Sequence, residues 1–192
     1  IGLTTGCVVV EGGRRPRRVP DGHSGSHTSW WSDDVVREKG EYRNGLRHGW
    51  VETFHGSGGL ASAAEYFEGV PVGEIRHYHP EGSLAVTEHV EGGTLQGPRY
   101  VYWPDGSVRA SNIYQDGLRH GPELQVAEDG RPLVEGSWRH GEKVGRWVFH
   151  DAGGRIDRIE HYWLSGGEPV GYLETVYETG SRASVQTLMS AE

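Results

Sequence analysis

Glycine recurs with a period of 24 residues, and this spacing constrains the fold more than any other feature of the chain. Two sets of glycines, starting at Gly45 and Gly58, advance in steps of 24, 24, 24, 24 and 26 residues. A third set advances by the same steps, and we call its members the anchor glycines: Gly49, Gly73, Gly97, Gly121, Gly145 and Gly171. A fixed period of this length is typical of repeat proteins, in which each unit is one supersecondary structure that its neighbours bury.

Each repeat has the sequence pattern of a β-hairpin. The segment Arg99–Trp103 is rich in aromatic and β-branched residues, and Pro104-Asp-Gly106 follows it as a turn. A second turn contains Asn44-Gly45, a strong hairpin signal. The second strand ends at an aromatic residue in most units, and Val90 takes this slot once: the aromatic ladder is Tyr42, Tyr66, Tyr114, Trp138 and Tyr162. The chain is therefore predicted to be all-β, an elongated antiparallel β-hairpin repeat array in the form of an open solenoid or meander sheet with a 24-residue period.

The repeats divide the chain into two regions. Residues 25–188 are expected to form the repeat domain, with about six full units and a degenerate N-terminal unit in which Asp34 replaces the turn glycine. Residues 1–24 are expected to be the end of a signal peptide and a basic disordered tether. The last step of 26 residues places a two-residue insertion between Tyr162 and Gly167, and because turns tolerate insertions we expect a connection there. Pro132 and Gly136 should make the fifth strand pair irregular.

Counting odd and even positions from the anchor glycine predicts which side chains share a face. The rows 5, 11, 13 and 17 positions after the anchor, which include Phe54, Leu60 and Tyr102, have one parity and should form an apolar face with the aromatic ladder. The mixed row, which should lie on the other face, is Thr53, His77, Val101 and Gln125. The ladder is expected to hold hairpin to hairpin, and it is also a possible binding face.

The unit Gly40-Glu-Tyr-Arg-Asn-Gly-Leu-Arg-His-Gly49, together with Pro104-Asp-Gly-Ser107, resembles the MORN-repeat variant (membrane occupation and recognition nexus) of bacterial YwqK-type antitoxins. The resemblance covers about residues 40 to 181. It implies a hairpin array that serves as a scaffold or binding surface, and it transfers no catalytic residue to this chain.

The only cysteine lies in a motif of its own. Leu3-Thr-Thr-Gly-Cys7 is similar to the end of a bacterial lipobox, and an Arg-rich stretch follows it. Cys7 is therefore a candidate for lipidation, which would anchor the chain and leave the repeats in water. A free thiol in a disordered segment is the other interpretation.

Composition argues against several classes of function. The net charge of -8 disfavours nucleic acid or a bilayer surface as a partner of the repeats, so contact with a membrane is expected only through the lipid. Neither a zinc site of cysteines nor a nucleophile or phosphate-loop motif occurs, and the carboxylates are expected to form a solvated face. Although there are 11 histidines, we expect no metal site, no cofactor and no enzymatic activity.

Two functions remain open at this stage. The first is a non-enzymatic repeat scaffold or protein-binding module of the bacterial envelope, carried by an outer-membrane lipoprotein that faces an aqueous compartment. The second is an antitoxin-like binder of a toxin partner in the cytoplasm. Both need a protein partner, which the sequence does not identify.

Overall fold

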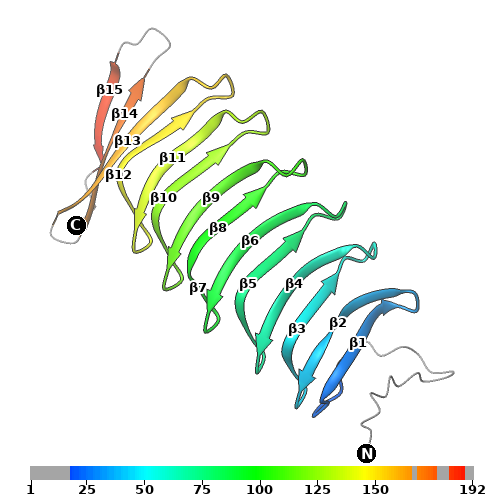
Figure 1. Cartoon of the computed structure of the whole chain (residues 1–192). Coiled ribbons are helices and arrows are strands. Elements are labelled where there is room, and N and C mark those ends of the chain that lie inside the picture. The colour runs from blue at the N-terminus through cyan, green and yellow to red at the C-terminus, as the bar shows by residue number, and fades with distance from the viewer. Residues whose placement is uncertain (1–17, 166–167, 177–181, 189–192) are drawn as a thin grey trace, which may run out of the picture. The chain divides into compact units, whose positions relative to one another are not determined.

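The computed structural model describes residues 18–165, 168–176 and 182–188, with side chains as far as Trp163. Its regular structure is antiparallel β throughout these residues, which confirms the predicted fold class (Figure 1). Strand order in the open sheet follows chain order, and the short β7 lies beside β6. The strands are β1 (Gly25–Ser32), β2 (Val35–Arg43), β3 (Leu46–Phe54), β4 (Leu60–Phe67), β5 (Val70–Tyr78), β6 (Leu84–Glu91), β7 (Thr94–Leu95), β8 (Gly97–Tyr102), β9 (Val108–Gln115), β10 (Leu118–Val126), β11 (Pro132–Arg139), β12 (Glu142–His150), β13 (Ile156–Ser165), β14 (Glu168–Val176) and β15 (Arg182–Leu188).

The chain forms two compact units, which we describe separately. Of the described residues, the first comprises 18–84 and 90–93 and contains β1 to β5. The second comprises residues 85–89 and 94–192 and contains β7 to β15, while β6 contributes residues to both. Within each unit, consecutive strands pair antiparallel, except that β7 pairs with β6 and not with β8.

Turn chemistry explains why the hairpins form where they do. Asn44 and Gly45 both adopt positive φ, 51° and 80°, as a two-residue turn that matches the twist of a hairpin requires. At the other end of a repeat, in the turn between β8 and β9, the Asp105 carboxylate accepts hydrogen bonds from the backbone N–H and the hydroxyl of Ser107, at 2.8 and 2.6 Å. These local interactions define the ends of the strands.

Successive hairpins are also joined through their turns. The N–H of Gly69 donates to the carbonyl of Arg47 in the preceding hairpin at 2.8 Å, and in the second unit the N–H of Gly141 donates to the carbonyl of Arg119 at 2.8 Å. At the opposite edge of the first unit, the Trp31 indole N–H donates to the Phe54 carbonyl at 3.0 Å. Each hairpin therefore depends on its neighbours, as expected of a repeat array.

The strand register corrects the predicted faces. Gly49 pairs with Tyr66 and Val51 with Ala64, so the offsets of cross-strand partners from the anchor sum to 17, an odd number. Cross-strand partners point to the same face of the sheet. A residue at an even number of positions after the anchor in the first strand therefore shares its face with residues at odd numbers of positions in the second strand. The mixed row is therefore on the same face as the ladder, as shown by the pairs Thr53 with Ser62, Ser62 with His77, Val101 with Ala110 and Gln125 with Val134. We call this side of each unit the ladder face.

The row five positions after the anchor lies on the other side, which we call the opposite face. Phe54 follows Thr53 in β3, and its ring centroid lies 5.6 Å from the Lys39 ammonium, which pairs with Glu52. Phe54 pairs with Leu60 across a register shift. This bulge in the hairpin is the reason that a simple parity count fails.

The structure also bears on two expectations about irregular segments. The expectation of a connection is wrong for the segment from Trp163 to Ser165, which belongs to β13, where Trp163 pairs with Val170. The rest of that segment, residues 166–167, lies outside the described residues. The strand that contains Pro132 and Gly136 is β11, and it pairs with both β10 and β12. Its register shifts where Pro132 pairs with Val126 and again between Glu135 and Ser137, so this strand is irregular at both residues. Gly136 has a specific packing role, described below.

Candidate functional site

A charged and aromatic cluster occupies the ladder face of the first unit. Glu38 is 8% exposed, and the Arg47 guanidinium donates to both of its carboxylate oxygens, at 2.8 and 2.7 Å. The Tyr42 hydroxyl donates to the same carboxylate. Arg47 also donates to the Tyr66 hydroxyl at 3.1 Å and lies 5.0 Å from the centroid of that ring. One arginine thus links two successive rings of the ladder.

The second unit repeats this arrangement with other residues. Glu123 is 4% exposed and accepts hydrogen bonds from Arg119 at 3.2 Å, from Gln125 at 2.5 Å and from the Trp138 indole N–H. The Arg119 guanidinium lies 4.9 Å from the Trp138 ring centroid. Arg119 pairs with Tyr114 in the register, so it too bridges two positions of the ladder.

A third cluster surrounds Lys143 in β12. Its ammonium lies 4.4 Å from the ring centroid of Trp147 and 5.4 Å from that of Tyr162, and it contacts Glu160 at 3.5 Å. The Tyr162 hydroxyl donates to Glu160 at 2.8 Å, and Arg158 donates to it at 2.7 Å. A cation two positions before the anchor therefore recurs as Arg47, Arg119 and Lys143, each against the next ring of the ladder. The sequence analysis missed this row, although its spacing is visible in the sequence.

Glu38 and Glu123 are exceptions to the expected solvated carboxylates because they are buried, whereas most described Asp and Glu residues are exposed. Burial alone would raise the pKa of Glu38, but hydrogen bonds from Arg47 and Tyr42 outweigh it and hold the pKa below its usual value. The pKa of Glu160 is lowered in the same way, against burial, chiefly by Arg158 and Tyr162. Burial, together with the hydrogen bond to Glu160, raises the pKa of Tyr162 to about 12. As a general acid near neutral pH, a glutamate needs a raised pKa and a tyrosine a lowered pKa. The pKa values of Glu38, Glu160 and Tyr162 are shifted in the opposite directions, which suits these groups to holding the ladder together.

Side-chain size is matched between facing positions of successive hairpins. A Cβ on Gly136 would lie 2.2 Å from the indole of Trp147, a side chain that is only 1% exposed. A Cβ on Gly40 would lie 2.7 Å from Val51. Gly136 therefore provides the space that Trp147 fills, which explains a glycine in the middle of a strand.

The opposite face of the second unit carries an exposed apolar patch over β8, β9 and β10. Pro98 pairs with Ile113, and Ser111 pairs with both Tyr100 and Leu124, so these side chains are neighbours on one face. Tyr100, Ile113 and Leu124 are 39%, 38% and 37% exposed. We define the Tyr100 patch as Pro98, Tyr100, Ile113, Pro122 and Leu124.

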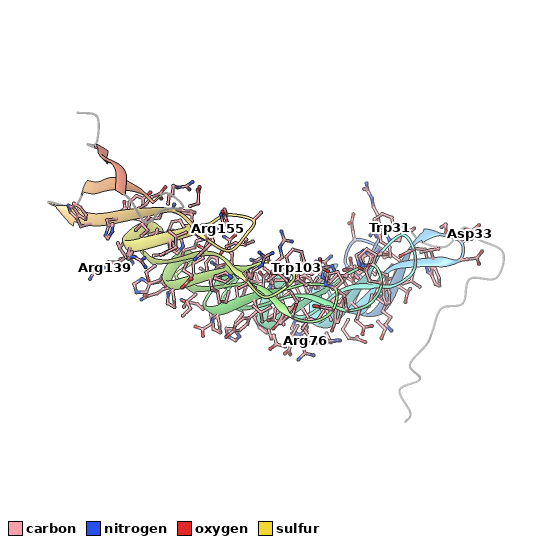
Figure 2. The ribbon with its side chains drawn as sticks, turned by 90° about the horizontal axis from the view of Figure 1, so that it is seen from above. Trp31, Asp33, Arg76, Trp103, Arg139 and Arg155 are labelled. Atoms are coloured by element: carbon pink, nitrogen blue, oxygen red, sulfur yellow. The ribbon has the colours of Figure 1, made fainter. Side chains whose placement is uncertain are left out.

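The opposite face of the first unit has a different character. The exposed Trp50 pairs with Glu65 in the register. Ion pairs join Lys39 to Glu52 at 2.9 Å and Arg76 to Glu74 at 2.5 Å, so this side of the first unit carries more charge. Arg76 and Trp31 project to opposite sides of the ribbon in Figure 2. The Tyr100 patch itself contains no charged residue, and the exposed Glu135, which pairs with Leu124, lies at its border. Because its apolar residues come from three adjacent strands, the patch is the better candidate for an apolar contact.

The predicted site residues lie as follows. The anchor glycines with positive φ are Gly49, Gly73, Gly97, Gly121 and Gly145, and Gly171 pairs with Tyr162. The ladder residues are part of the clusters above, and Tyr42 is 5% exposed. Cys7 lies outside the described residues.

Neither a metal centre nor a membrane-spanning helix is found in the described part of the chain. Within it, three or more His, Cys, Asp or Glu side chains nowhere gather closely enough to hold an ion. His55 instead donates to the Tyr78 carbonyl at 3.0 Å. Among residues 18–165, 168–176 and 182–188, no helix has the length and apolarity needed to cross a membrane.

No protein-family model and no curated protein sequence matches this chain.

Proposed function

We propose that the chain is a non-enzymatic protein-binding module, a hairpin-repeat scaffold whose contact surface is the Tyr100 patch. The observation that carries this proposal is the contrast between the two faces of the second unit. On the ladder face, Glu123, Arg119 and Trp138 are engaged with one another, whereas on the opposite face Tyr100 and Leu124 are more than a third exposed. The resemblance to the MORN-repeat variant supports the same function.

The patch has the chemistry of a protein contact. A tyrosine and two branched aliphatic side chains offer apolar area, and the tyrosine hydroxyl adds a polar handle. Charged residues are depleted at the centres of protein interfaces, and none lies within the patch. A protein partner with an exposed apolar surface is therefore the expected ligand.

Site-specific photo-crosslinking tests this surface. We expect p-benzoylphenylalanine in place of Leu124, in cells of the native host, to form one discrete adduct after irradiation, because this position lies within the patch. The matched control replaces Glu128, an exposed residue in the turn after β10 of the same unit. Adducts that are equally strong at both positions, or missing from Leu124, would show that the patch is not the contact surface.

We further propose that the module is displayed on the bacterial envelope through a lipid on Cys7. The support is the lipobox-like Leu3-Thr-Thr-Gly-Cys7 and the basic stretch that separates it from β1. Since each buried CH₂ of an acyl chain contributes about 0.8 kcal/mol, two or three chains would hold even this acidic protein at a membrane. Val8 follows the cysteine where an Asp would signal retention at the inner membrane, which favours the outer membrane.

Detergent partitioning of the native full-length precursor tests the anchor. We expect the wild type to enter the detergent phase and Cys7→Ser to remain almost entirely in the aqueous phase, because the substitution removes the acylated sulfur and leaves the described structure unchanged. If wild type and Cys7→Ser are equally soluble, the envelope proposal fails and the cytoplasmic antitoxin-like binder takes its place.

A further inference from the structure

The first strand of the sheet is an edge whose own sequence carries little protection against pairing. Among the described residues β1 pairs with β2 alone. Its sequence, Gly25-Ser-His-Thr-Ser-Trp-Trp-Ser32, has no charged residue and no proline. Exposed edges of natural sheets are normally blunted by charges, prolines or bulges. Here a bulge lies near Trp30, and the segment before β1 contacts the strand, with a hydrogen bond between the Arg18 backbone and His27.

The last described strand is also an edge, with a complementary place in the repeat. β15 pairs with β14, and its Leu188 pairs with the anchor Gly171. Leu188 therefore takes the position that the aromatic ladder occupies in the other repeats. β1 begins at Gly25, which pairs with Tyr42 as Gly49 pairs with Tyr66. In the repeat, the strand that follows a ladder position contains an anchor glycine. β1 of a second copy contains Gly25 in that role, so it has the right pattern to follow β15.

We propose that copies of this chain associate head to tail, with the edge of β15 in one copy pairing with the edge of β1 in the next. The occupant of the β1 edge is thus a second copy of this chain, because the contact continues a register that the sheet already uses. Charge favours the same pair of edges: β1 is uncharged and β15 has Arg182 as its only charged residue, although the chain carries a net charge of -8. Pairing between two β1 strands would break the period.

The repeat specifies the register of this contact. Between successive hairpins, the residue 15 positions after one anchor pairs with the residue two positions after the next, as in Gly40 with Val51, Asn112 with Glu123 and Glu160 with Leu173. Gln186 is 15 positions after Gly171, and His27 is two positions after Gly25. Gln186 of one copy should therefore lie opposite His27 of the next.

Two measurements test the proposal on the full chain. Light scattering of the otherwise wild-type Cys7→Ser protein should give a weight-average mass above the 21.2 kDa of the monomer, increasing with concentration, because a head-to-tail contact leaves a free edge at each end. In the same background, His27→Cys with Gln186→Cys should form a ladder of disulfide-linked multimers on oxidation, since opposed antiparallel residues have the Cα separation of a disulfide. Thr28→Cys with Gln186→Cys is the control, because residue 28 points to the other face of β1.

The outcomes separate clearly. The head-to-tail contact is supported if the mass grows with concentration, or if the copies close into a ring, and if the disulfides are specific to position 27. A mass of 21.2 kDa at every concentration overturns it. A plateau at the dimer, or multimers as abundant from Thr28→Cys as from His27→Cys, overturns it as well. None of these results depends on the Tyr100 patch.

Discussion

Gly136→Ala is expected to lower the free energy of unfolding by about 3 kcal/mol or more, at the upper end of the cost of overpacking. The added methyl group would lie 2.2 Å from the indole of Trp147. That indole is 1% exposed and donates a hydrogen bond to the Ser137 carbonyl at 3.1 Å, so it has little room to move away. The midpoint of urea unfolding measures the loss.

Two controls identify the cause of this effect. Gly56→Ala lies in open space, with no atom within 4 Å of the new Cβ, and its cost should be within about 0.5 kcal/mol of zero. In a Trp147→Ile background, Gly136→Ala should cost less than about 1 kcal/mol, because the repeat uses Ala64 and Ile75 at the same two positions. An equal cost of Gly136→Ala with Trp147 and with isoleucine would refute the size-matched pair.

Trp138→Ala should cost about 3 kcal/mol or more, the usual range for removing a large aromatic side chain from a packed position. The Trp138 ring makes an edge contact with Trp147 at 5.1 Å between centroids and supports the Arg119 guanidinium at 4.9 Å. Its N–H also donates to the buried Glu123, whose carboxylate would lose that partner. Urea unfolding again gives the value.

Substitution of the same residue by phenylalanine separates these contributions. Trp138→Phe keeps a ring between Arg119 and Trp147 but removes the donor to Glu123, so it should cost about 1.5 to 3 kcal/mol and less than the alanine variant. Trp50, which is 47% exposed on the opposite face of the first unit, is the matched control, and Trp50→Ala should cost no more than about 1 kcal/mol. Similar losses for Trp50→Ala and Trp138→Ala would contradict a structural role for the ladder.

The hairpins and their turns could be predicted from the sequence because their determinants are local. Asn44-Gly45 adopts the positive φ angles that such a turn requires, and every strand begins or ends near a glycine of the period. The aromatic slot was located for the same reason: the distance from an anchor glycine to its ladder residue is constant, as in Gly49 with Tyr66 and Gly121 with Trp138.

The assignment of faces and the buried charges could not be predicted, because they depend on contacts between strands. A bulge beside Phe54 breaks the count of odd and even positions, and nothing local to that residue marks it. In the sequence alone, Glu38 has the features of an exposed carboxylate. Its partner Arg47 is nine positions later in the next strand, and the two meet only when β2 pairs with β3. Glu123 likewise meets the Trp138 indole only when β10 pairs with β11.

The central claim is that each hairpin is held by its neighbours in a 24-residue repeat, and hydrogen exchange of Trp138→Ala tests it most directly. Trp138 lies in β11 and contacts Trp147 of β12 and Glu123 of β10. Because coupling in repeat proteins is between nearest neighbours, faster exchange should be concentrated in β10 to β13, while β2 to β5 retain wild-type protection. Exchange that increases evenly along the whole chain would contradict the repeat account.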